Sequence, residues 1–211
     1  ITQEMFEDNQ FPGMFDSAAN LGRSFARKRQ KDAANLFNNA FSSSDVGYDS
    51  KPLVAADHPR SKTDDTAVSN YFGAKALNSD NLEAAQLQLE ELGDENGELT
   101  GAMATLLLVG RQQRMKAKQL VESQLEPESA NNAVNVHQDM SYLVHPRITG
   151  KKWFVVDVPQ SLMQLKWIDR IQPQYNGTWD NGNTLVRAWY GRMRYAIGWS
   201  DWRSIVGSNP S

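Results

Sequence analysis

The stretch that decides the fold is Phe15–Phe41, FDSAANLGRSFARKRQKDAANLFNNAF. Apolar and small residues recur along it every three or four positions, which is the spacing of one helical face. The members of this face are Phe15, Ala18, Ala19, Gly22, Phe25, Ala26, Ala33, Leu36, Phe37, Ala40 and Phe41. At about 1.5 Å per residue the predicted helix is roughly 40 Å long, well above the mean helix length. Such a helix in a chain of 211 residues indicates an architectural role.

The flanking sequence predicts where this helix begins and ends. Pro12-Gly13 is a turn signal, so we expect the helix to begin after it. The side chains of Ser42-Ser43-Ser44-Asp45 compete with the backbone for hydrogen bonds, which favours a helix end after Phe41. A stretch of about 35 residues rich in Ser, Asp, Lys and Pro follows, and irregular segments of that length are typical of interaction loops.

The composition is that of a globular protein, with 40% hydrophobic residues, 22% charged residues and a net charge of −3. This charge gives no reason to expect strong nonspecific binding to nucleic acid or to an anionic membrane. The absence of cysteine excludes disulfides, thiolate catalysis and cysteine-based metal sites. The apolar run Met103–Val109 is far shorter than the ~20 residues that cross a bilayer, so we expect no membrane partner.

The middle of the chain mixes helix and strand patterns, which indicates an α/β or α+β fold. Asp80 and Glu83 form a capping box for a helix that runs through Leu92. Further predicted elements are strands over 103–109, 140–144 and 153–158, and a helix over 111–123 with Met115, Leu120 and Val121 pointing inward. Strict alternation from Leu185 to Ile197 predicts a long strand near the C-terminus.

Two polar groups could carry chemistry. Asp57-His58, with further aspartates nearby, could bind a metal ion or act as an acid–base pair. No metal-ligand spacing supports such a site, so a polar loop with a histidine before Pro59 is the favoured interpretation. The acidic run Glu90–Glu98 is interpreted as a solvated surface around a helix end. GxSxG, P-loop and GxGxxG motifs are absent, and we predict neither a catalytic site nor a cofactor.

Basic and aromatic residues raise the question of nucleic-acid binding. The cations of the long helix could follow phosphates, but such a row is more often a solvated face or one that pairs with acidic neighbours. Trp199, Trp202 and Arg203 could stack on bases or on a sugar. All six tryptophans lie between residues 153 and 202, which is more typical of a packed aromatic core or a subunit contact.

The order and spacing of several short motifs carry a resemblance that covers nearly the whole chain. These motifs are Ala33–Phe41 (AANLFNNAF), Asp49–Leu53, Asp57-His58-Pro59, Ser69-Asn70, the helix from Asp80, the strand and helix over 103–123, Trp153-Phe154 and the ending Tyr195–Gly207 with GWSDWR at 198–203. In this order they resemble the Mu-like major head subunit family, which are tailed-phage capsid proteins of the Hong Kong 97 type. Ser50 departs from the pattern, because the family often has Gly there.

The resemblance implies an α+β fold with a discontinuous peripheral domain and an axial domain. Residues 1–77 would form the peripheral domain, with a spine helix over about 15–41 and an interaction loop. Residues 78–183 would form the axial domain, and the strand within 184–211 would complete the peripheral domain. The family's N-terminal arm and extended loop would precede Ile1, so we expect upstream sequence.

The function implied is that of the major capsid protein of a tailed double-stranded DNA bacteriophage or prophage. Hexamers and pentamers of this chain would assemble in the bacterial host cytoplasm into an icosahedral shell. The implied partners are portal and scaffold or protease proteins of the phage, and packaged DNA by nonspecific contact. The candidate subunit contacts are Arg23, Arg27, Lys31, Asp57, His58, Trp199, Trp202 and Arg203. The alternatives are an encapsulin-like shell protein, a soluble metal-dependent hydrolase that uses Asp57 and His58, and a nucleic-acid-binding module.

Overall fold

A computed structural model describes residues 7–8, 11–125, 134–181 and 186–210. The chain divides into two compact units, which we name the helix–ribbon unit (residues 1–33 and 167–197) and the sheet unit (residues 34–166 and 198–211). The boundaries between the units fall at residues 33/34, 166/167 and 197/198, each inside a long helix or strand. Helices and strands are both well represented, which is compatible with the predicted α+β class. The peripheral and axial assignments stay a prediction, and the predicted boundary at residue 183 lies outside the described residues.

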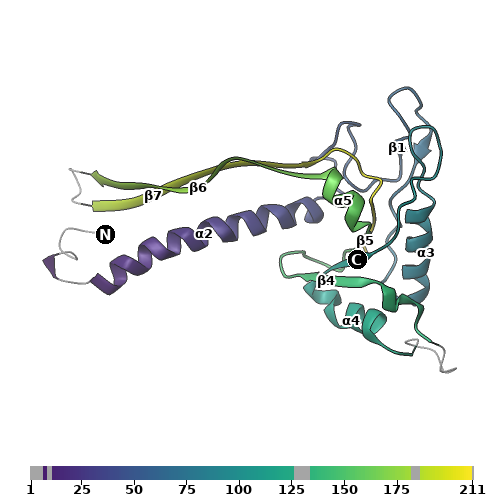
Figure 1. The fold of residues 1–211 in the computed structure, drawn as a ribbon, viewed down its shortest axis with the longest axis horizontal. Coiled ribbons are helices and arrows are strands. Elements are labelled where there is room, and N and C mark those ends of the chain that lie inside the picture. Colours follow the sequence, from purple (N-terminus) through teal and green to yellow (C-terminus); the bar gives the residue numbers. More distant parts are fainter. Residues whose placement is uncertain (1–6, 9–10, 126–133, 182–185, 211) are drawn as a thin grey trace. The chain divides into compact units, whose positions relative to one another are not determined.

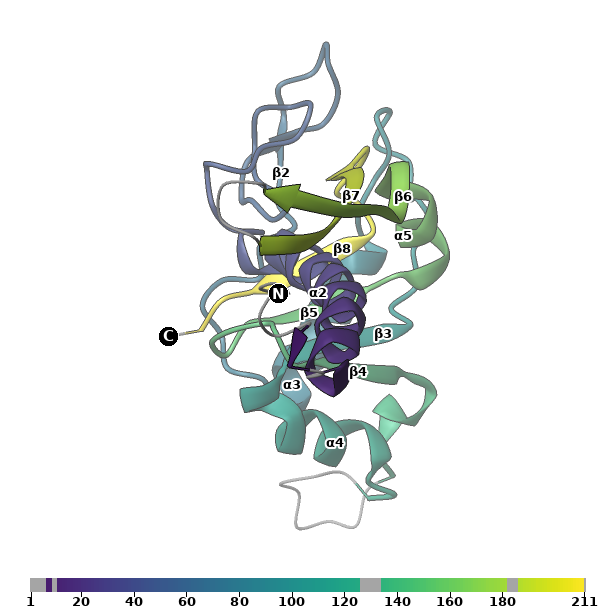
Figure 2. The same cartoon turned by 90° about the vertical axis from the view of Figure 1, so that its left-hand side faces the viewer.

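The helix–ribbon unit consists of most of helix α2 (Phe11–Asn38) beside a two-stranded ribbon of β6 (Leu165–Asn181) and β7 (Val186–Trp199). Figure 1 shows the two strands running along the helix, and Figure 2 looks along the helix with both strands on the same side of it. A salt bridge of 2.9 Å joins Arg29 of the helix to Asp169 of β6. A two-stranded sheet has little stability alone, so one face of the ribbon needs this support.

The long helix is confirmed, but both of its predicted ends are wrong. It begins at Phe11 and contains Pro12-Gly13, because proline is tolerated in the first helical turn, where its missing N–H would be unsatisfied anyway. It ends at Asn38, three residues before Phe41. The Asn38 side chain there donates to the Arg147 carbonyl at 2.9 Å and accepts from the Thr149 N–H at 2.9 Å. The chain then leaves the helix in turns, with Phe41 stacked on Phe154.

The sheet unit is built on four strands in the order β4-β3-β5-β8. Strand β3 (Leu106–Gly110) pairs in parallel with β4 (Ser141–His145) and antiparallel with β5 (Trp153–Val156), which pairs antiparallel with β8 (Ile205–Ser208). Helix α3 (Ser79–Glu90) packs against β5 and β8, and α4 (Arg114–Glu122) packs against β3 and β4. The core includes the fully buried Leu107, Trp153, Phe154, Val155, Ile205 and Val206.

The predicted elements of this unit exist, with shifted limits. Helix α3 is capped by Asn78, whose side chain accepts from the Asn81 N–H, so the predicted capping box at Asp80 is wrong. The second predicted helix begins with a 3₁₀ turn (Arg111–Gln113), and Met115, predicted to point inward, is 75% exposed. The strand predicted over 153–158 stops at Val156, because Asp157 caps the short helix α5 (Val158–Gln164). A further 3₁₀ turn spans Val136–Asp139.

The long polar segment after α2 is more ordered than its composition predicts. It contains two short strands, β1 (His58–Pro59) and β2 (Ala67–Val68), which pair antiparallel. Its apolar island is part of the core, since Leu53, Val54 and Ala55 are buried. Strand β6 was not predicted from the sequence, whereas β7 confirms the long strand expected near the C-terminus.

Candidate functional site

A buried polar cluster of the sheet unit is centred on His58, one of the predicted acid–base candidates. Its imidazole is fully buried, and its Nδ1–H donates to Asp49 Oδ2 at 2.6 Å. The ring stacks on Trp202 with the ring centres 4.1 Å apart. Burial lowers the pKa of His58, and this effect outweighs the opposing effect of Asp49. Burial thus favours the neutral form of His58, which lies between an aspartate and an indole, and its Nε2 has no hydrogen-bond partner in the structure.

Asp57 does not join this pair. Its side chain is 59% exposed and forms a salt bridge with Lys51. In the described residues no three His, Asp or Glu side chains come together in a group that could hold a metal ion. Two groups that are adjacent in sequence thus lie in different surroundings, and the geometry gives no support to a hydrolytic centre at Asp57 and His58.

Arg203 joins three segments of the sheet unit from a nearly buried position. Its Nε donates to the Gly93 carbonyl at 3.0 Å, its Nη1 to Asp201 Oδ1 at 3.0 Å, and its Nη2 to the Arg60 carbonyl. The guanidinium also lies 4.7 Å from the centre of the Trp202 ring. Charge-assisted hydrogen bonds of this kind are stronger than neutral ones, so Arg203 fixes the chain beyond β7 against the two loops.

Asn70 also joins the segment after α2 to the C-terminal part of the sheet unit. Its side-chain oxygen accepts from the Ala55 N–H at 2.9 Å, and its amide donates to the Leu53 and Ile205 carbonyls at 2.9 and 3.0 Å. The backbone of residues 70–73 also bonds to β8, since the Gly207 N–H donates to Asn70 and the Phe72 N–H donates to Gly207. The segment after α2 is therefore fastened to the C-terminal strand.

The eight predicted contact residues fall into two groups. His58, Trp202 and Arg203 are buried by their own chain, and Trp199 is partly buried. Arg23, Arg27, Lys31 and Asp57 are exposed. The spacing of four places the three cations of α2 in one row along the helix. In the structure of the single chain, only this second group is fully available to a neighbouring molecule.

Arg29 lies outside that row and has a different role, which the sequence interpretation missed. Besides its salt bridge to Asp169, its guanidinium lies 4.8 Å from the centre of the Trp167 ring. Trp167 in turn stacks on Tyr195 of β7 at 4.8 Å. Burial and the hydrogen bond that Tyr195 donates to Asp32 raise the pKa of Tyr195 to about 12. These contacts form a clamp between α2 and the ribbon.

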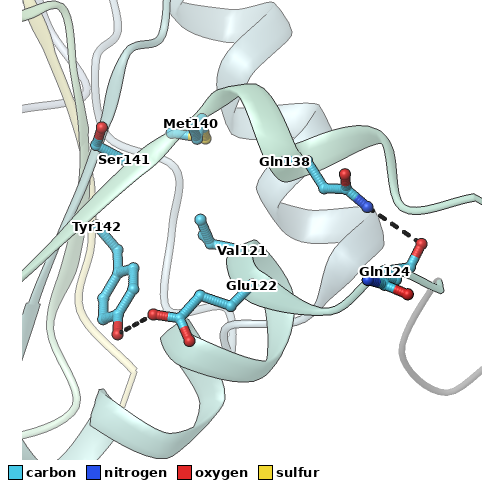
Figure 3. A pocket seen from close by; sticks show the side chains of 7 residues that line it. All are labelled: Val121, Glu122, Gln124, Gln138, Met140, Ser141 and Tyr142. Atoms are coloured by element: carbon cyan, nitrogen blue, oxygen red, sulfur yellow. Dashed lines mark hydrogen bonds between the residues drawn. The ribbon is translucent and has the colours of Figure 1, made fainter.

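A shallow, open hollow of about 500 Å³ lies beside α4 in the sheet unit (Figure 3). Tyr142 donates to Glu122 Oε1 at 2.8 Å on one side of it, and Gln138 donates to the Gln124 carbonyl at 3.1 Å on the other. Its polar groups thus bond to one another rather than converge on a common point. The hollow shows none of the features expected of an active site.

Several large apolar side chains are exposed in both units. Examples above 60% exposure are Leu99, Met103, Met115, Leu162, Met163 and Ile168. Only a contiguous patch of such residues marks a site of protein–protein contact, and single exposed apolar side chains are common on monomeric proteins. No helix in the described part of the chain is long and apolar enough to cross a membrane.

A comparison with protein families decides what kind of protein has these surfaces. A model of a family described as phage capsid protein matches residues 1–208. The chain belongs to the phage capsid protein family. A search of curated proteins found no match. The family is structural and is not a known enzyme family. For the function of this capsid protein, the exposed surfaces that can contact other molecules are therefore more relevant than the hollow beside α4.

Proposed function

We propose that this chain is the major capsid protein of a tailed double-stranded DNA bacteriophage or prophage, and that its copies assemble into an icosahedral shell around the genome. The family match over residues 1–208 carries the proposal. The finer assignment, to the Mu-like major head subunits with a Hong Kong 97-type fold, rests on the order of the sequence motifs.

Two elements of the structure support this assignment. Helix α2, at 28 residues, has the length expected of a spine helix, and a mixed sheet flanked by helices suits an axial domain. In the proposed arrangement residues 1–77 and the strand within 184–211 belong to the peripheral domain, and residues 78–183 form the axial domain. The interaction loop corresponds to the segment after α2.

The mechanism proposed is burial of surface between copies, with no chemical step. Head-to-tail contacts close into the rings of hexamers and pentamers, and obligate interfaces of this kind bury on the order of 2,000 Å² or more. The exposed cations Arg23, Arg27 and Lys31 are proposed to face acidic surface on a neighbour, and Asp57 lies at the loop proposed to reach it. Portal, scaffold or protease proteins, and DNA bound nonspecifically, are the proposed partners in the host cytoplasm.

Negative-stain electron microscopy of the expressed full-length protein tests the proposal. We expect closed shells or capsomer rings. A strictly monomeric protein with stoichiometric bound zinc would refute it in favour of the hydrolase. Nucleic acid inside the particles supports a phage head, whereas packaged protein cargo would indicate an encapsulin-like compartment.

A further inference from the structure

The ribbon of β6 and β7 has one face that no element of its own unit covers. Trp167 and Asp169 of β6 contact Arg29, and Tyr195 of β7 bonds to Asp32, so these side chains lie on the face toward α2. Successive side chains of a strand point to opposite faces. The alternating residues therefore form the outer face, and its exposed members in the described part of the helix–ribbon unit are Ile168, Arg170, Gln172, Gln174, Asn176, Tyr190, Arg192, Arg194 and Ala196.

The charged side chains of this outer face that the structure describes are all positive. Arg170, Arg192 and Arg194 are exposed, and none of them forms an ion pair or a side-chain hydrogen bond with the residues that the structure describes. Among the described side chains of β6 the one carboxylate is that of Asp169, which is on the inner face and is paired with Arg29. Arg192 and Arg194 are two positions apart on one strand, which places their Cα atoms roughly 7 Å from each other.

The face also has apolar character. Ile168 is 62% exposed and Tyr190 is 46% exposed. Unpaired arginines mixed with an aliphatic and an aromatic side chain are typical of a protein contact, because arginine and tyrosine are enriched in interfaces. A surface that only follows phosphates needs no such apolar residues.

The sheet unit carries a surface of the complementary kind at the end of α3. The turn after this helix is closed by Asp94, whose carboxylate accepts from the Asn96 and Glu98 N–H groups at 2.7 and 3.0 Å. Around this turn Glu90, Glu91, Glu95 and Glu98 are exposed, and none of them has an ion-pair partner among the described residues. Leu99 adjoins them and is 70% exposed. We name this surface the acidic turn.

We infer that the outer face of the β6–β7 ribbon is the docking surface for the acidic turn of a second copy of this chain. The inference rests on the proposed self-assembly and specifies one of its contacts. Arg170, Arg192 and Arg194 pair with the glutamates of the turn, and Leu99 packs against Ile168 and Tyr190. The two surfaces differ, so the contact is head-to-tail and can be repeated from copy to copy around a ring.

A cysteine pair tests this contact, because the chain has no cysteine of its own. Copies of the full-length protein with Ala196→Cys are mixed with copies of a different tagged mass that carry Asn96→Cys, so that all charges are kept. Under mild oxidation we expect a disulfide-linked heterodimer on a non-reducing gel. The matched control replaces Asn96→Cys with Met115→Cys, an equally exposed position on α4.

Charge exchange in the same mixture tests the pairing itself. We expect Arg192→Glu with Arg194→Glu on one copy to lower the cross-linked fraction about tenfold, because like charges then face each other across the contact. Glu95→Lys with Glu98→Lys on the other copy should lower it similarly. The two reversals combined should restore it. All positions are exposed, and unchanged thermal melting shows that the variants fold.

The outcomes separate this contact from self-assembly as such. Particles of the unmodified protein without a cross-link above the Met115 control would overturn the contact and leave the proposed function standing. Neither particles nor a cross-link would refute both. A specific cross-link restored by charge exchange supports the contact even where closed shells do not form. If the arginine reversals abolish binding to duplex DNA and no cross-link forms, the face is a nucleic-acid surface and the inference is wrong.

Discussion

Replacing Asn70 with alanine is expected to destabilise the sheet unit more than its single small side chain suggests. The amide connects Leu53 and Ala55, in the segment after α2, to Ile205 in β8 through three hydrogen bonds of 2.9 to 3.0 Å. Asn70 is fully buried, so water does not replace these bonds in the folded variant. Each lost bond costs about 1 kcal/mol, and more where a buried group stays unsatisfied, so we expect a loss on the order of 3 kcal/mol.

Urea unfolding measures this loss. The buried Trp153 and Trp202 lie in the same unit, so part of the tryptophan fluorescence reports on it. With a slope of about 2 kcal/mol per molar urea, the midpoint should fall by roughly 1.5 M. The isosteric variant Asn70→Asp should also lose stability, because it replaces the two donated bonds with a buried carboxylate facing two carbonyls.

The control is Asn96→Ala, which removes an exposed amide from the acidic turn. Surface substitutions of this kind change stability by about 0.5 kcal/mol or less. If Asn70→Ala shifted the urea midpoint no more than Asn96→Ala does, the view that Asn70 fastens the segment after α2 to β8 would be wrong.

Three further predictions concern assembly, packing and pH. Charge reversal at Arg27 and Lys31 should impair particle formation, measured by sedimentation, without changing the melting curve measured by circular dichroism. Normal particles would refute the contact proposed for this row. Gly191→Ala should lower the free energy of unfolding by about 1 to 3 kcal/mol, as a thermal melt can show. The added Cβ would lie 2.6 Å from a carbonyl oxygen of β6 and 2.9 Å from a phenyl ring of α2. Gly198→Ala is the control, because its Cβ would meet nothing within 4 Å. The pKa of His58 is lowered from 6.5 in the folded chain, so the unfolded chain binds this proton more tightly and stability is lost as the pH falls below 6.5. The urea midpoint should therefore drop more between about pH 7.5 and 5.5 in the unmodified protein than in His58→Gln; equal drops would contradict this.

Periodicity predicted the elements whose apolar residues recur at regular spacing in the sequence. The three-or-four spacing around Phe25 and Leu36 identified the long helix, and the alternation up to Ile197 identified β7. The ends of α2 were missed because tertiary contacts determine them. Asn38 stops the helix by bonding to residues more than a hundred positions away, which no local pattern shows. Strand β6 was missed because its polar and aromatic residues alternate only weakly.

The surroundings of the candidate site residues also depend on tertiary contacts that local sequence patterns do not show. Adjacency suggested that Asp57 and His58 act together, but the fold buries one and exposes the other. Helical spacing could have separated Arg29 from its neighbours, since Phe25, Arg29 and Asp32 fall on one face of α2. The burial of Trp202 depends on the loop that passes over it, and this pairing of distant segments is not encoded in any short stretch.

The most direct test of the central claim is the mass of the full-length protein in solution. Sedimentation velocity over a wide concentration range should reveal species far larger than one 23.7 kDa chain, either closed shells or discrete rings of five and six copies. A single boundary at the mass of the monomer under all conditions would contradict the proposal that this capsid-family protein builds a shell from its own copies.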